Sequence, residues 1–150
     1  TPPLRTKSDV EGIIEGLKDG TIDAIATDHA PHSAEEKGRP LTGAPSGMVG
    51  LETALGVTLT ALYHTGEMGL SDILRKMTMN PACILRIPHK GRLAIGGDGD
   101  LVIFNPDEKW TVDPEKFHSK GRNTPFAGME LKGRVKYTVV GGKIVYQDQP

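Results

Sequence analysis

The chain has 150 residues and a mass of 16.1 kDa, which is enough for one domain with its own hydrophobic core. Its 18 basic and 19 acidic side chains nearly cancel, so neither a nucleic acid nor an anionic membrane is an expected partner. No apolar stretch approaches the roughly 20 residues that span a bilayer, and the single cysteine cannot form an internal disulfide. We therefore expect a cytoplasmic protein, with a secreted protein that lacks disulfides as the alternative.

The first predicted element is an amphipathic helix near the start of the sequence. Ser8 and Glu11 have the spacing of a capping box, and Gly20 supplies a C-terminal stop. Four apolar side chains before this stop recur at helical spacing. They are Val10, Ile13, Ile14 and Leu17. Residues 22–27 then form a short, mostly apolar run, which predicts a buried parallel strand that ends at Asp28.

A long loop and two helices are predicted next. Residues 33–50 are rich in Glu, Lys, Gly, Pro and Ser, and a loop of this length usually has a function. Within it, residues 35–37 are expected to form a solvated, charged face. Apolar residues at helical spacing then predict one helix over residues 51–64 and another over residues 70–77.

A short fourth helix is predicted around Pro81, because proline suits a first helical turn. Asn80 is its expected cap, and Ile84 and Leu85 are expected to face the core. Cys83 lies on the same helix. We expect this cysteine to be a small buried hydrophobe rather than a nucleophile.

The pattern changes from helical to alternating after Ile87. Short β-type runs follow, and Gly141-Gly142 between the last two is the signal of a two-residue hairpin. These runs are residues 90–93, 101–104, 135–140 and 143–146. We predict two pieces, an α/β piece over residues 1–86 and a β-rich piece over residues 87–150. One parallel strand cannot form a sheet alone, so the first piece is expected to be part of a larger fold.

Polar side chains gather where the predicted strand ends. Asp28, His29 and His32 lie there, and α/β folds collect reactive groups at this end of their strands. A carboxylate in this place can bind a cation and can move a proton between water and a leaving group. In the alternative reading, Asp28 caps the turn and the histidines make loop hydrogen bonds, which is the role expected for His29.

Several motifs, in order along the chain, resemble one enzyme family. They are Ala26-Thr27-Asp28-His29-Ala30-Pro31-His32, Gly50-Leu51-Glu52-Thr53-Ala54, Trp110-Thr111-Val112-Asp113-Pro114 and Ser119-Lys120-Gly121-Arg122-Asn123-Thr124-Pro125-Phe126. Together they resemble the C-terminal portion of the type I bacterial dihydroorotases, which are members of the amidohydrolase superfamily. A run of matches in order is far more specific than any one of the motifs.

The resemblance implies a fold and a reaction. The fold is α/β: the last strand and helices of a (β/α)8 barrel over residues 1–86, then a small β-rich accessory domain of composite β-sandwich type over residues 87–150. The reaction is the zinc-dependent, reversible interconversion of N-carbamoyl-L-aspartate and dihydroorotate in pyrimidine biosynthesis. Opening a cyclic amide needs an activated hydroxide, a base and donors for a carboxylate, which agrees with the residue types present.

The resemblance also implies roles for individual residues. Asp28 would touch the zinc and act as the general acid/base, and His32 would hold the substrate carboxylate. Ser46 and Gly47 would meet the substrate through their backbone. Thr1 stands where the family usually has a substrate-binding asparagine, and its hydroxyl cannot offer the paired donor and acceptor of an amide.

The remaining zinc ligands of the family correspond to sequence upstream of this chain, so the chain alone is expected to be inactive. A hydantoinase or allantoinase is one alternative, although these relatives generally lack the whole Asp-His-Ala-Pro-His string that ends at His32. A metal-free, dihydroorotase-like scaffold is another. Besides the small-molecule substrate, the expected partners are the missing barrel portion, another copy of the chain, or an aspartate transcarbamoylase.

Overall fold

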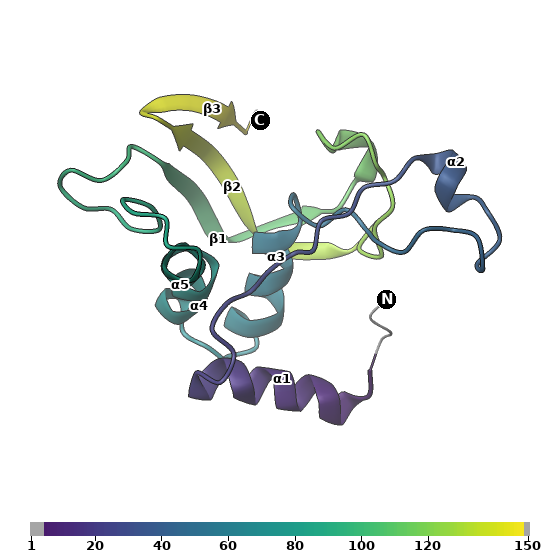
Figure 1. The fold of residues 1–150 in the computed structure, drawn as a ribbon, viewed down its shortest axis with the longest axis horizontal. Coiled ribbons are helices and arrows are strands. Elements are labelled where there is room, and N and C mark those ends of the chain that lie inside the picture. The colour runs from purple at the N-terminus through teal and green to yellow at the C-terminus, as the bar shows by residue number, and fades with distance from the viewer. Residues whose placement is uncertain (1–4, 149–150) are drawn as a thin grey trace.

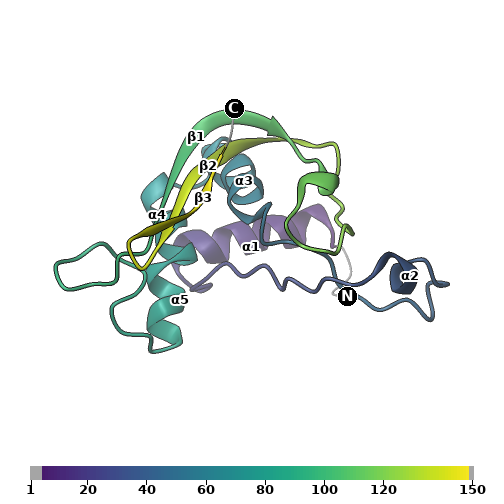
Figure 2. The ribbon, with the colours of Figure 1, turned by 90° about the horizontal axis from the view of Figure 1, so that it is seen from above.

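The computed structural model describes residues 5–148, in which helices precede an antiparallel sheet (Figure 1). The helices are α1 (Lys7–Asp19), α2 (Ala34–Lys37), α3 (Ala54–Thr58), the π-helical turn η1 (Leu59–Tyr63), α4 (Leu70–Met77), α5 (Met79–Ile84) and the 3-10 turn η2 (Pro114–Lys116). The strands are β1 (Leu101–Thr111), β2 (Glu130–Val140) and β3 (Lys143–Gln147). Figure 2 shows the sheet arching over α3, with α1 on the far side of α3 and α2 projecting on its own loop. Within residues 5–148 no helix is long and apolar enough to cross a membrane.

Helix α1 is capped two residues before the predicted position. The Thr6 hydroxyl accepts a hydrogen bond from Asp9 N, and the Asp9 carboxylate accepts one from Thr6 N at 2.9 Å. The capping box is therefore Thr6 with Asp9, and the prediction of Ser8 with Glu11 is wrong. Two overlapping patterns with the same spacing compete here, and the earlier one lengthens the helix. Gly20 ends the helix with φ of 87°, as predicted.

Residues 22–27 are extended but pair with no strand in the described part of the chain. Their backbone bonds instead to the end of α4, where Ile25 N donates to Lys76 O at 3.1 Å. Just beyond the segment, a single parallel bridge joins His29 to Met48. Residues 22–27 therefore form no strand within the described chain, because a strand exists only where a neighbouring strand satisfies its backbone groups, and their pairing in a larger fold stays a prediction.

The predicted loop and the next two helices are present, and the first of these helices begins later than predicted. Helix α2 interrupts the loop, where Ser33 and Glu36 form a reciprocal capping box. The helix predicted over residues 51–64 begins at Ala54, and its last turn, η1, is π-helical. Helix α4 coincides with the helix predicted over residues 70–77.

Helix α5 forms where a helix was predicted, but its side chains behave differently. The Asn80 side chain donates to Asp23 O at 2.8 Å instead of capping the helix. Ile84 and Leu85 are 58% and 67% exposed, and Cys83 is exposed as well, so all three predictions of burial are wrong. Six residues make less than two turns, which is too short for the spacing of apolar residues to fix a buried face.

The three strands pair antiparallel in the order β1-β2-β3. The ladder between β1 and β2 extends over nearly the whole of both strands, so they are longer than the predicted runs. Residues 90–93 form no strand, because Gly91 turns the chain there with φ of 77°. Gly141 and Gly142 have φ of 56° and 74°, and the predicted hairpin between β2 and β3 is confirmed.

Two buried clusters hold the helices against one another and against the sheet. The first consists of Leu17, Leu59, Leu62, Met68 and Ile73, with Phe104 of β1 packed on it. The second consists of Val49, Val112, Phe117 and Leu131. Gly56 lets α3 approach the sheet, since a Cβ there would lie 3.1 Å from Cζ2 of Trp110. The second cluster joins residues from both sides of position 87, so the division into two pieces stays a prediction.

Candidate functional site

Asp28 lies where the extended segment turns into the long loop. Its φ is 47°, a left-handed backbone that is uncommon for residues with a side chain, although Asp and Asn adopt it more readily than most. Such a conformation persists only where the surrounding structure imposes it, and it often marks a functional position. The Asp28 residue is exposed, so its carboxylate is open to a ligand.

His29 joins this loop to the segment before α3. Its Nδ1 atom accepts hydrogen bonds from Gly50 N at 3.0 Å and from Leu51 N at 3.3 Å. A ring nitrogen that accepts carries a lone pair, so the proton of the neutral ring lies on Nε2. The expected role of His29 in packing the loop is confirmed.

His32 and Gly47 are brought together from opposite ends of the loop. A Cβ built on Gly47 would lie 2.7 Å from the Cβ of Ala30 and 3.4 Å from Nε2 of His32, and the Gly47 φ is 124°. No residue with a side chain fits that place or that backbone. On the other side of the ring, His32 Nδ1 lies 3.6 Å from the Glu36 carboxylate.

Glu36 is held in its charged form beside the His32 ring. The Ser33 backbone N–H donates to the Glu36 carboxylate at 3.0 Å, and the Ser33 hydroxyl donates at 3.1 Å. These bonds, the backbone one first, hold the pKa of Glu36 below its usual value. The capping box of α2 therefore places a fixed negative charge next to His32.

The Ser46–Gly47 turn is held by two side chains that the sequence did not indicate. Lys37 Nζ donates to the carbonyls of Pro45 and Gly47, both at 2.9 Å. Asn123 Nδ2 also donates to the Gly47 carbonyl, at 3.0 Å. The expectation that residues 35–37 form only a solvated face is therefore wrong for Lys37. Ser46 itself is exposed.

Residues 118–123, which are part of the loop between β1 and β2, pack on the Ser46–Gly47 turn and are called here the strap. In Figures 1 and 2 this part of the chain runs beside the loop that carries α2. The Glu52 carboxylate accepts from the backbone N–H groups of His118 at 2.9 Å and Ser119 at 3.1 Å. Asn123 O accepts from Val49 N at 2.9 Å.

The strap also touches the loop that contains His32. A Cβ at Gly121 would lie 3.0 Å from the Cβ of Pro31 and 3.3 Å from the carbonyl of His32. The strap, the His32 loop and the Ser46–Gly47 turn therefore form one packed unit. No local pattern predicts the contact of Asn123 with Gly47, because 76 residues separate them.

Asp28 carries a carboxylate, which is one of the donor types that zinc accepts. Within residues 5–148 no three His, Cys, Asp or Glu side chains converge on a point that could hold a metal ion. A catalytic zinc takes about three protein ligands. Asp28 therefore fits a zinc site by its donor type, whereas the described residues do not bring together the set of ligands that such a site needs. The remaining predicted site residue, Thr1, lies outside the described residues.

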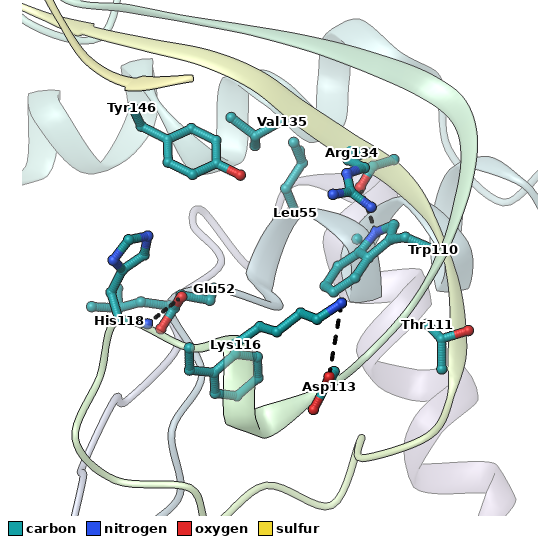
Figure 3. Close-up of a pocket in the computed structure, with 14 residues that line it drawn as sticks. Glu52, Leu55, Trp110, Thr111, Asp113, Lys116, His118, Arg134, Val135 and Tyr146 are labelled. Carbon is teal, nitrogen blue, oxygen red and sulfur yellow. Dashed lines mark hydrogen bonds and ion pairs between the residues drawn. The ribbon is translucent and has the colours of Figure 1, made fainter. Parts of the chain in front are cut away.

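A separate hollow of about 300 Å³ lies between α3 and the sheet (Figure 3). Trp110, Tyr146 and Arg134 line it, with Glu52 and His118 at one side. Its charged groups are already paired within the chain: Glu52 binds the strap, and Arg134 pairs with Asp148 at 2.6 Å. None of the predicted site residues lines this hollow.

The comparisons with known proteins agree with the resemblance read from the motifs. The chain is 57% identical over 146 residues to a dihydroorotase from Caldanaerobacter subterraneus subsp. tengcongensis and 51% identical over 148 residues to one from Clostridium acetobutylicum. These alignments take in 97% and 99% of this chain but 33% and 35% of the relatives, so the chain spans about a third of their length.

Solved structures give the same family relationship. The L-hydantoinase (dihydropyrimidinase) from Arthrobacter aurescens superposes with a TM-score of 0.92 at 32% identity, over 100% of this chain and 34% of that one. The sequence model of the amidohydrolase family matches residues 2–145. That match takes in both the helices and the sheet, and the chain therefore belongs to the amidohydrolase family.

Proposed function

We propose that this chain is the C-terminal third of a dihydroorotase that interconverts N-carbamoyl-L-aspartate and dihydroorotate. The observation that carries the proposal is a difference in identity. The relatives named dihydroorotase are 51–57% identical to the chain, whereas the solved hydantoinases and dihydropyrimidinases that cover 98–100% of it are 23–32% identical. The activity belongs to the full-length protein, because the chain spans only about a third of those relatives.

The proposed architecture is the end of a (β/α)8 barrel over residues 1–86 and a β-rich accessory domain over residues 87–150. Two features support it. Residues 22–27 are extended and buried in part, as a barrel strand beside absent neighbours would be. Val10 and Ile13 on α1 are more than half exposed, and they would be covered by the rest of the barrel.

Asp28 is the proposed general acid/base. Bound zinc would polarise the amide and lower the pKa of water, with Asp28 as one of its ligands. The exposed Asp28 carboxylate would take a proton from the attacking water and return it to the amide nitrogen as the ring opens. Its constrained backbone supports this role, since a proton carrier must be held in one place.

His32, Ser46 and Gly47 are the proposed contacts for the substrate carboxylate. The approach of His32 to Gly47 supports a shared binding place, because a ring N–H and backbone N–H groups are suitable donors for a carboxylate. Thr1 is proposed as a weaker contact than the asparagine usual in the family. A cytoplasmic location and assembly with another copy or with an aspartate transcarbamoylase belong to the same proposal.

The test uses the full-length protein that carries this sequence. Purified with its metal, it should hydrolyse dihydroorotate at least about tenfold faster than hydantoin or allantoin, since the second histidine serves a carboxylate that those substrates lack. Elemental analysis should find zinc. Residues 1–150 alone should show neither turnover nor stoichiometric zinc, and adding the separately produced upstream portion should restore both.

Each other result of this test excludes the proposal. Preferred turnover of hydantoin would favour the hydantoinase alternative, which has the support of the TM-score of 0.92. A full-length protein that binds no zinc and turns over no cyclic amide would favour the metal-free scaffold. Activity of residues 1–150 alone would mean that the upstream ligands are unnecessary.

A further inference from the structure

The Ser46–Gly47 turn is held by its carbonyl oxygens. Lys37 Nζ is within 2.9 Å of both the Pro45 and the Gly47 carbonyl, so one ammonium group binds two peptide planes. A peptide unit is planar, and in the trans form its N–H points opposite its C=O. Fixing the Pro45 carbonyl therefore fixes the direction of the Ser46 N–H.

Asn123 fixes the second of these planes from the other side. Its Nδ2 donates to Gly47 O at 3.0 Å, while its own carbonyl accepts from Val49 N at 2.9 Å. The backbone bond holds the strap in place whatever the side chain is. The side-chain hydrogen bond to the Gly47 carbonyl can therefore be removed by substitution while the backbone bond to Val49 still attaches the strap.

Little freedom remains in the turn once these bonds are made. Gly47 has φ of 124° and closely approaches Ala30 and His32. Charged donors make stronger hydrogen bonds than neutral ones, so Lys37 is the larger of the two restraints. Lys37 and Asn123 therefore hold the peptide planes on both sides of the Ser46–Gly47 peptide, whose N–H belongs to Gly47, and so limit the directions in which that peptide can face.

We infer that Lys37 and Asn123 are positioning residues for the carboxylate-bearing cyclic amide, and that they act on its binding rather than on the chemical step. The inference rests on the proposed function. It makes Asn123, which lies in the β-rich half, part of the candidate site around His32 and Gly47 in the helical half. Neither residue touches the reacting atoms. Both act through the turn that would meet the substrate.

The experiment measures KM and kcat of the full-length enzyme on dihydroorotate. Lys37→Met keeps the length of the side chain and removes its donors, and it should raise KM about tenfold or more. Asn123→Asp keeps the shape and removes the donor, and it should raise KM about fivefold. In both variants kcat should stay within about twofold of wild type, as expected when only substrate binding is weakened.

Matched controls separate positioning from general stability. Lys120→Met removes an exposed lysine from the strap itself. Asn80→Ala removes an amide-to-carbonyl bond of similar length, 2.8 Å, at a place remote from the turn. Both should leave KM within about twofold of wild type, while Asn80→Ala lowers the unfolding midpoint as much as the Asn123 variant does.

The outcomes distinguish this inference from the proposed function. A wild-type protein without dihydroorotate turnover removes both. Active wild type with unchanged KM in Lys37→Met and Asn123→Asp overturns only the positioning role. A fall in kcat with unchanged KM also overturns it, because the two residues would then act on the reaction itself.

Discussion

The sheet and the segment that leads to Asp28 satisfy their backbone groups in different ways. Strands β1, β2 and β3 bond to one another along most of their length. Residues 22–27 have no ladder in the described chain, and their backbone groups bond to the end of α4 and to the Asn80 side chain. The sheet is therefore stabilised by hydrogen bonds between its own strands, whereas the candidate site is held by contacts from loops and from single side chains.

The same contrast appears in what fixes each region. A cluster of partly buried ion pairs holds the C-terminal end of the sheet, where Asp148 binds both Arg134 and Lys136. The candidate site is fixed by single side chains that bond to backbone atoms: the His29 ring accepts from two backbone N–H groups, and Lys37 and Asn123 donate to carbonyls. The site should therefore be more sensitive to single substitutions in function, and the sheet more sensitive to acid.

The largest effect is expected at Asp28. In the full-length enzyme, Asp28→Asn should lower kcat/KM on dihydroorotate by about 10²–10⁴-fold, because an amide cannot accept the proton. Asp23→Asn, in the same extended segment, is the matched control and should keep full activity. Retention of activity within about tenfold of wild type by the Asp28 variant would reject its role.

The next largest effect is expected at the buried contact between the helices and the sheet. Leu59 is fully buried between the helices and the sheet, so Leu59→Ala should cost about 2–5 kcal/mol of unfolding free energy, measured by urea unfolding. Ile144→Ala, on β3 and 61% exposed, should cost under about 0.5 kcal/mol. Equal costs would show that the described core does not hold the regions together.

Acid should distinguish the sheet from the site. Hydrogen bonds from Arg134 and Lys136 lower the pKa of Asp148 from 3.8 to about 2. A carboxyl whose folded pKa is depressed stabilises the fold above its unfolded pKa, and this contribution is lost as pH falls through the folded value. Between pH 4 and pH 2 the protein should lose up to about 2 kcal/mol from this group.

The check compares unfolding of wild type and Asp148→Asn from pH 6 to pH 2. The variant should be less stable at pH 6 and should lack the extra loss below pH 4. Asp107→Asn, an exposed position on the same sheet, should follow the wild-type curve. Parallel curves for wild type and Asp148→Asn would contradict the prediction.

The smallest effect is expected at His29. His29→Ala leaves the N–H groups of Gly50 and Leu51 without their acceptor and should cost about 1–2 kcal/mol. His29→Asn offers a side-chain oxygen in a similar place and should recover at least half of that loss. The thermal unfolding midpoints of the two variants test this prediction. If His29→Asn is no more stable than His29→Ala, the loss of stability comes from packing and not from the missing acceptor.

Local patterns predicted the features that depend on a few neighbouring residues. Gly20 ends α1, and the pair Gly141-Gly142 makes the hairpin, because both need only backbone freedom at one place. The motif around Asp28 and His32 indicated the family, which the match over residues 2–145 supports. The choice of cap at Thr6 was missed, since two patterns of equal spacing overlap.

Features that depend on distant residues could not be predicted in this way. The strand at residues 22–27 needs neighbours to exist as a strand, and the sequence pattern alone cannot supply them. The bond between Asn123 and Gly47 crosses 76 residues, and Glu52 reaches the strap across a similar separation. The prediction that Ile84, Leu85 and Cys83 are buried is wrong, because the six residues of α5 are too few to define a buried face.

The close approach of Gly56 to Trp110 gives the chain an internal optical reporter. Trp110 is the single tryptophan of the sequence, and its indole N–H donates to Gly133 O at 3.0 Å while its ring lies against α3. Fluorescence excited at the red edge of the absorption band therefore arises from one place in the chain, the seam between α3 and the sheet. A shift of that emission to longer wavelength records water entering this seam.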